Sequence, residues 1–279
     1  MLNKLRDFAR AMRAGADAAV RTEAVIRRQL QLQMLAELSA TPRFREPLRL
    51  LSHGYKIYSE GLEDGILAEI FQRIGTSNRR FVEIGVQDGT ECNSAYLLLH
   101  GWSGAWIEAD PVNAARARQL FATFPIEVAT EFATAENADA LISRLAPGNE
   151  LDLLSIDIDS SDYWLWKAVE TVRPRVVVIE YNATLPPPVR RTVAYPARAW
   201  NGSNYFGASL GALTALGQAK GYRLVGCSPA GVNAFFIRED LVEDRFCAPF
   251  TAENHYEPPR YYLSGPSGHE PGFGSWVEV

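Results

Sequence analysis

Near-continuous apolar runs alternate with helical segments through the middle of this chain, and this alternation limits its possible folds more than any other feature. The runs RFVEIGV, GAWIEAD, LDLLSIDI and RVVVIEYN occupy residues 80–86, 104–110, 151–158 and 175–182. Strands that are apolar on both sides are typical of a parallel sheet covered by helices on both faces. The sequence therefore predicts an α/β fold with a doubly wound, mostly parallel sheet.

Three shorter runs complete a predicted sheet of seven strands, at 126–130, 222–227 and 233–238. A short turn rich in Ser, Pro and Gly separates the last two runs, which predicts an antiparallel hairpin at the sheet edge. Helices are predicted at 58–75, 90–100, 113–124, 135–145, 163–172 and 210–220, from apolar spacing and from Gly or Pro stops.

The ends of the chain differ from this central region, and three segments are predicted. Residues 1–50 read as a helical extension, 51–245 as the α/β domain, and 246–279 as a Pro-, Gly- and Tyr-rich lid or tail. Residues 1–30 hold seven Lys or Arg and three acids, whereas the whole chain has a net charge of −5. Packing in a homo-oligomer and peripheral contact with an anionic membrane both remain open for the extension.

Charge and composition exclude several classes of protein. An acidic chain argues against a nucleic-acid partner, which normally selects a basic surface. No apolar run reaches the length of a transmembrane segment. The three cysteines are odd in number and widely spaced, which favours a reducing, cytoplasmic location over a disulfide framework.

Acidic residues and glycines gather where the predicted strands end, at the edge where open α/β sheets bind ligands. The first strand ends in a glycine loop with an acid two residues before the first glycine, which would repel a pyrophosphate and suit a cationic ligand. Glu108 ends the next strand, at the spacing of an acid that binds ribose hydroxyls. The predicted cofactor-binding residues are Glu83, Gly85, Gln87, Asp88, Gly89, Glu108 and Asp157.

With these motifs the chain resembles the class I S-adenosylmethionine-dependent methyltransferases, and within them the FkbM-like group. The resemblance rests on FVEIGVQDG, GWSGAWIEADP, LDLLSIDID and the terminal GYRLVG…GVNAFFIR hairpin, and it covers about residues 58–238. Gln87 replaces the middle glycine of the family's loop. The resemblance implies S-adenosyl-L-methionine as cofactor, with Glu83 and Gly85 near the methionine part, Glu108 on the ribose, and Glu131 or Asn137 near the adenine.

Three carboxylates follow the fourth strand in the stretch SIDIDSSD, and Asp157 and Asp159 share one face of it. Like charges this close repel, so they need solvent, a shared proton or a cation. We predict Asp157, Asp159, Glu180 and Asn182 as ligands of Mg²⁺ or Mn²⁺, whose preferred donors are oxygens. Two alternatives stay open: Asp157 or Asp159 as a general base without metal, or acids that only cap helices, as is expected for Asp162.

Aromatic and polar residues after the fourth and fifth strands are candidates for the substrate wall, since Trp and Tyr faces with Asn suit a carbohydrate. His255 and His269 in the tail are candidate lid residues, whereas Trp166 and Phe206 are expected in the core. The predicted substrate residues are Tyr163, Trp164, Tyr195, Trp200, Asn204, Tyr205 and His255.

Together these features predict an O-methyltransferase acting on a hydroxyl of a small molecule or glycan. The sugar or surface-polysaccharide substrate is implied by the resemblance alone. Two other classes remain open: a metal-dependent enzyme of different chemistry on the same fold, and a non-catalytic nucleotide-binding or assembly subunit.

Overall fold

The computed structural model describes residues 2–146, 148, 150–197, 199–261 and 268–279, and the chain divides into two compact units, Met1–Arg45 and Glu46–Val279. The first unit consists of one long helix, α1 (Leu2–Ser39), and the short α2 (Pro42–Arg45). Ile26 and Leu30 of α1 are more than half exposed. In the part of the chain that the structure describes, no helix is long and apolar enough to cross a membrane. A role of this unit in self-association or at a membrane surface stays a prediction.

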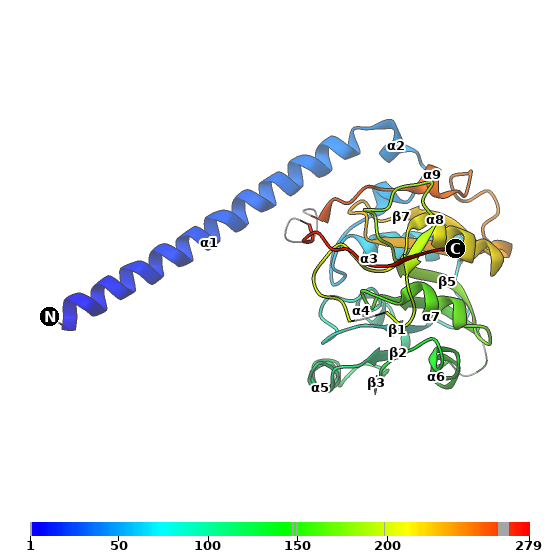
Figure 1. The fold of residues 1–279 in the computed structure, drawn as a ribbon, viewed down its shortest axis with the longest axis horizontal. Helices are drawn as coiled ribbons and strands as arrows, with labels where there is room; N and C mark the ends of the chain where they lie inside the picture. The colour runs from blue at the N-terminus through cyan, green and yellow to red at the C-terminus, as the bar shows by residue number, and fades with distance from the viewer. Residues whose placement is uncertain (1, 147, 149, 198, 262–267) are drawn as a thin grey trace. The chain divides into compact units, whose positions relative to one another are not determined.

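The second unit is built around a seven-stranded sheet in the order β3-β2-β1-β4-β5-β8-β7 (Figure 1). The first five of these strands are parallel, and β8 runs antiparallel to both β5 and β7. This confirms the predicted fold class, including the antiparallel hairpin at the edge. The strands are β1 (Arg80–Ile84), β2 (Ser103–Glu108), β3 (Ile126–Thr130), β4 (Glu150–Ile156), β5 (Arg173–Glu180), β7 (Tyr222–Cys227) and β8 (Asn233–Arg238).

Two apolar cores cover the two faces of the sheet, because successive strand residues point to opposite sides. Phe81 belongs to the core beneath α3 (Glu63–Ile74), α4 (Ala95–Leu98) and α5 (Pro111–Leu120). Its neighbour Val82 belongs to the core beneath α6 (Ala138–Leu145), α7 (Asp162–Ala168) and α8 (Leu210–Ala219). The strands are thus buried on both sides, as their near-continuous apolar sequences predicted.

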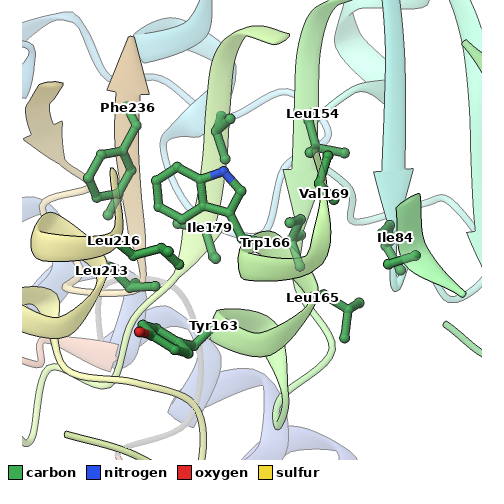
Figure 2. Packing of buried hydrophobic residues seen from close by; sticks show 14 of the residues in the cluster. Ile84, Leu154, Tyr163, Leu165, Trp166, Val169, Ile179, Leu213, Leu216 and Phe236 are labelled. Atoms are coloured by element: carbon green, nitrogen blue, oxygen red, sulfur yellow. The ribbon is translucent and has the colours of Figure 1, made fainter. Parts of the chain in front are cut away.

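Trp166 anchors α7 to the sheet. Figure 2 shows its indole lying against the strands beside Phe236 of β8, and the two ring centroids are 4.8 Å apart. Trp166 and Phe236 are almost completely buried, as expected for Trp166 from the sequence. This packing holds α7 against the sheet, and α7 directly follows the acidic loop after β4.

The helix predicted at 90–100 is reduced to α4. Residues 88–94 form turns instead, and the backbone N–H groups of Asn93 and Ser94 donate to the carboxylate of Glu83 on β1, at 2.8 Å each. Because these two N–H groups donate to a carboxylate beneath the loop, they are not available for the hydrogen bonds of a longer helix. Helical spacing alone does not reveal such a competing contact.

The C-terminal residues return to the domain and are partly ordered by strand pairing. β9 (Trp276–Glu278), red in Figure 1, pairs antiparallel with the short β6 (Arg191–Val193). The backbone N–H of Gly272 donates to Asn204 Oδ1 at 2.7 Å, and Tyr205 Oη donates to the Ser275 carbonyl at 2.7 Å. The remaining short elements are α9 (Ala252–His255) and the 3₁₀ turns η1 (Leu51–His53) and η2 (Glu239–Leu241).

Candidate active site

A cavity of about 860 Å³ opens where the parallel strands end, within the range of about 300–1,000 Å³ typical of ligand pockets. Its walls come from the residues that follow β1, β2, β3 and β4, from Glu180 at the end of β5, and from parts of the chain beyond β6. The carboxyl edge of the sheet is thus the candidate site, as expected for an open α/β sheet.

The glycine loop after β1 forms one side of this cavity. Gly85 has φ of 86°, and a Cβ atom there would lie 1.7 Å from the Asp157 carbonyl oxygen, so only glycine fits. Gln87 has φ of 51° and lines the cavity with Asp88. Gly89 packs instead against Trp106, where a Cβ would lie 2.4 Å from the ring. The loop therefore exposes backbone to a ligand at Gly85–Asp88.

Glu83 lies beneath the loop and is not among the described residues that line the cavity. Glu83 is 2% exposed, and its carboxylate accepts hydrogen bonds from the N–H groups of Asn93 and Ser94 and from the hydroxyls of Ser94 and Ser155. Burial raises its pKa, and these hydrogen bonds oppose that rise. In the structure Glu83 orders the loop from inside the protein.

Glu108 ends β2 and does line the cavity. One carboxylate oxygen accepts from the Gln87 N–H at 2.7 Å, and the other from the Asp110 N–H at 2.8 Å. Each oxygen retains a second acceptor position, so the carboxylate can still receive two hydroxyl groups. Glu131 also lines the cavity, whereas the Asn137 amide is bonded to backbone groups of Thr134 and Phe132.

Asp157, Asp159 and Glu180 form an acidic cluster in which one oxygen from each residue lies within 4.8 Å of the others. Burial, together with the charges of the neighbouring carboxylates, raises the pKa of Asp157 and of Glu180 well above the usual range, and burial raises the pKa of Asp159. Glu180 is 7% exposed, and its Oε2 atom is buried without a hydrogen-bond partner. Asp159 also holds a left-handed backbone conformation, with φ of 57°.

Two other polar residues predicted near this cluster have different contacts. Asp162 turns back on its own loop and accepts from the N–H groups of Ile158 and Ser160, at 2.8 and 3.0 Å. Burial raises the pKa of Asp162 to about 7, although these hydrogen bonds oppose the rise. The Asn182 amide donates to the carbonyls of Asn204 and Phe206 and accepts from Thr184, and Asn182 does not line the cavity. The structure therefore brings together three of the four predicted metal ligands, all of them carboxylates.

The predicted substrate residues divide into two groups. Tyr195 and Trp200 line the cavity, and Trp200 Nε1 donates to the Ser203 carbonyl at 2.7 Å. Trp164 lies behind Tyr195, with ring centroids 5.8 Å apart, and its indole donates to the Val193 carbonyl. Those that are absent from the described lining are Tyr163, Trp164, Asn204, Tyr205 and His255.

Several lining residues were not singled out from the sequence, or were named only as lid candidates. Glu60 reaches the cavity because Asp64 binds the N–H groups of residues 57–59 and draws this segment toward the sheet. Tyr261 and His269 reach it from the tail, with stacked rings 4.8 Å apart. A buried Asp near a helix start, here Asp64, could have indicated that Glu60 reaches the cavity. No periodic pattern in the sequence indicates the same for Tyr261 and His269.

No protein-family model and no curated protein sequence matches this chain. Among solved structures it is similar to an O-methyltransferase from Bacillus cereus in complex with SAH, at 19% identity and a TM-score of 0.34, over 56% of this chain and 66% of that one. It is also similar to the N-terminal domain of EvdMO1 in the presence of SAH and D-fucose (14%, 0.41, over 76% and 94%). A third is Streptomyces venezuelae DesVI (12%, 0.41, over 63% and 89%).

Proposed function

We propose that this protein is an S-adenosylmethionine-dependent methyltransferase that acts on a hydroxyl group, with a sugar as the expected acceptor. The observation that carries the proposal is the content of one cavity: a backbone-exposing glycine loop, Glu108 with free acceptor positions, and the acidic cluster of Asp157, Asp159 and Glu180. A nucleoside with a cationic centre and no pyrophosphate is complementary to this combination.

The donor is assigned to the side formed by the glycine loop and β2. Glu108 would accept the ribose hydroxyls, and the backbone at Gly85 and Gln87 permits close approach of the methionine part. The sulfonium charge favours a site with a surplus of carboxylates. Glu83 would act indirectly, by holding the loop that carries these groups.

Methyl transfer requires little covalent help from the protein, since aligning the reacting atoms supplies much of the acceleration. The acceptor hydroxyl must lose its proton, and Asp157 or Asp159 is the proposed base. Burial raises the pKa of both carboxyl groups, which makes the ionised carboxylate a stronger base than an ordinary aspartate.

The acidic cluster also fits a divalent cation. Three carboxylates with oxygens close to one another, one of them buried without a hydrogen-bond partner, form a donor set that Mg²⁺ or Mn²⁺ prefers. We propose Asp157, Asp159 and Glu180 as its ligands, without the predicted Asn182. Such an ion would offset the mutual repulsion of the carboxylates and would polarise an acceptor oxygen.

Calorimetry with S-adenosylhomocysteine tests the donor assignment. We expect the wild-type protein to bind it, and Glu108→Gln to weaken binding by about tenfold, because the ribose loses a charged acceptor. Glu253→Gln, an exposed position outside the described cavity lining, should leave binding unchanged. Absence of binding to the wild type would reject the methyltransferase proposal and favour another enzyme on this fold.

A methyl-transfer assay on simple glycosides, with Mn²⁺ and with EDTA, tests the chemistry and the ion separately. Transfer that stops in EDTA and returns with Mn²⁺ supports the ion. Full transfer in EDTA would remove the ion and leave the carboxylate base. Donor binding without transfer to any hydroxyl would support a non-catalytic role.

A further inference from the structure

The charge of the cavity limits which acceptors can enter it. Among its described lining residues, eight are carboxylates and none is Lys or Arg. His269 is the sole histidine among them, and burial lowers its pKa, so it adds no positive charge at neutral pH. The eight acids are Glu60, Asp88, Glu91, Glu108, Glu131, Asp157, Asp159 and Glu180.

Compensating cations are found only for some of these acids. Arg116 lies 3.1 Å from Asp88, Lys56 lies 3.5 Å from Glu91, and Arg144 pairs with Glu131. In the described part of the chain, no Lys or Arg forms an ion pair with Glu60, Glu108 or the acidic cluster. A divalent cation would leave the three ionised carboxylates of the cluster with one negative charge, so it would not turn the cluster into a site for an anion. With or without an ion, no Lys or Arg among the described lining residues is available to pair with an anionic acceptor.

The described lining of the cavity also contains aromatic residues, among them Tyr195, Trp200 and Tyr261. Trp200 lies edge-on to His269 with ring centroids 5.1 Å apart, and the Tyr261 ring stacks on the His269 ring. Two contacts hold the tail against the loop that carries Trp200. One is a β-bridge between Ser203 and Glu270, and the other is the hydrogen bond that the Gly272 N–H donates to Asn204. Aromatic faces of this kind bind the C–H faces of a sugar ring and carry no charge to attract an anion.

We propose that the acceptor is a polyol that carries no phosphate, so that methylation follows the glycosyl transfer that removes the sugar from its nucleotide diphosphate. This inference rests on the function proposed above. In the step, an acceptor oxygen–carbon bond forms while the sulfur–carbon bond breaks, the sulfonium becomes a neutral thioether, and the hydroxyl proton passes to a carboxylate and then to water. A sugar phosphate or nucleotide sugar would bring a second anion into a cavity that lacks a charge partner for it.

Matched acceptor pairs test the proposal: methyl hexosides against the same hexoses as 1-phosphates, after binding of S-adenosylhomocysteine has been established. A protein that does not bind S-adenosylhomocysteine would contradict the proposed methyltransferase function. That result is distinct from a failure to discriminate between the two acceptors. We expect transfer to the neutral member to exceed transfer to the phosphate by at least about tenfold, with the difference shrinking at high salt. Where neither member is methylated, both are titrated into the protein saturated with S-adenosylhomocysteine.

A charge-reversal variant separates cavity charge from shape. Glu60→Lys at the cavity mouth should reduce the discrimination severalfold, whereas Glu253→Lys, with the same change in net charge outside the described lining, should not. Arg198 lies outside the described residues, so Arg198→Gln is measured alongside. Equal or better use of the phosphate member, binding of neither member, or equal discrimination in both Lys variants would overturn the proposal.

Discussion

An aspartate lies at each end of β4, and the surroundings of the two differ: Asp152 is buried within the strand, whereas Asp157, directly after it, is half-buried. At the amino end, Asp152 is fully buried, accepts from the N–H groups of Ser77, Asn78 and Arg79, and lies 3.1 Å from the Arg175 guanidinium. At the carboxyl end, Asp157 shares a cluster with two further acids and has no such cation among the described residues.

We interpret this difference as one between carboxylates that stabilise the fold and carboxylates that are proposed to bind a ligand. Glu83 and Asp162 lie near the site, but like Asp152 they accept several donors from the protein. Glu180 Oε2 accepts none, although it is buried. A buried oxygen left without a partner is costly, so its retention at a cavity is best explained by a cation or a donor group that arrives with the ligand.

The largest effect is expected at the amino end. Asp152→Ala should lower the free energy of unfolding by about 3–5 kcal/mol, because it leaves Arg175 and three backbone N–H groups without their acceptor. Urea denaturation of the whole chain measures this. Asp240→Ala, which removes an exposed partner of Arg238, should cost less than about 1 kcal/mol. Similar losses in the two variants would break the distinction drawn here.

Glu180→Gln should differ from Asp152→Ala by lowering activity without lowering stability. Methyl transfer is expected to fall about 100-fold, equivalent to about 2.7 kcal/mol, because the site loses a ligand and a negative charge. The thermal midpoint should stay the same or rise, since a repulsive contact is removed without loss of a hydrogen bond at Oε2. A strongly destabilised variant would instead make Glu180 a scaffold residue.

Stabilisation by Mn²⁺ should depend on pH. The raised pKa values of Asp157, Glu180 and Asp162, the last at about 7, mean that the folded protein binds more protons than the unfolded chain above about pH 4. Without an ion, stability from these groups therefore falls as pH rises through the folded pKa values. An ion competes with those protons, so its stabilisation should grow from pH 6 to pH 8, reaching about 2 kcal/mol at roughly thirty times Kd. An equal shift at both pH values, or a shift retained in Glu180→Gln, would contradict this assignment.

His269 provides the smallest test. Burial lowers its pKa, so the unfolded chain takes up a proton first and stability is lost as pH falls below the ordinary histidine value of about 6.5. His269→Gln should remove this loss, which we expect to be below about 1 kcal/mol, in thermal unfolding at pH 7.5 and 5.5. The exposed His100 provides the control variant His100→Gln, which should behave as the wild type does.

The sequence predicted the sheet well because apolar strand runs and glycine stops are local signals. It also predicted that Glu108, Asp157, Asp159 and Glu180 would meet, since strand ends of a parallel sheet share one edge. It did not predict that the Asn182 amide would be fully used by the loop at 204–206, or that Glu83 would point beneath its own loop. These outcomes depend on contacts between distant segments, as does the approach of Tyr261 and His269 from the tail.

The close approach of Gly85 to the Asp157 carbonyl has a kinetic consequence. With no space between these two backbone segments, a donor that shifts the glycine loop must also shift Asp157. In the proposed methyltransferase, we therefore expect donor binding to change the acceptor side of the site, with the nucleoside entering before the acceptor.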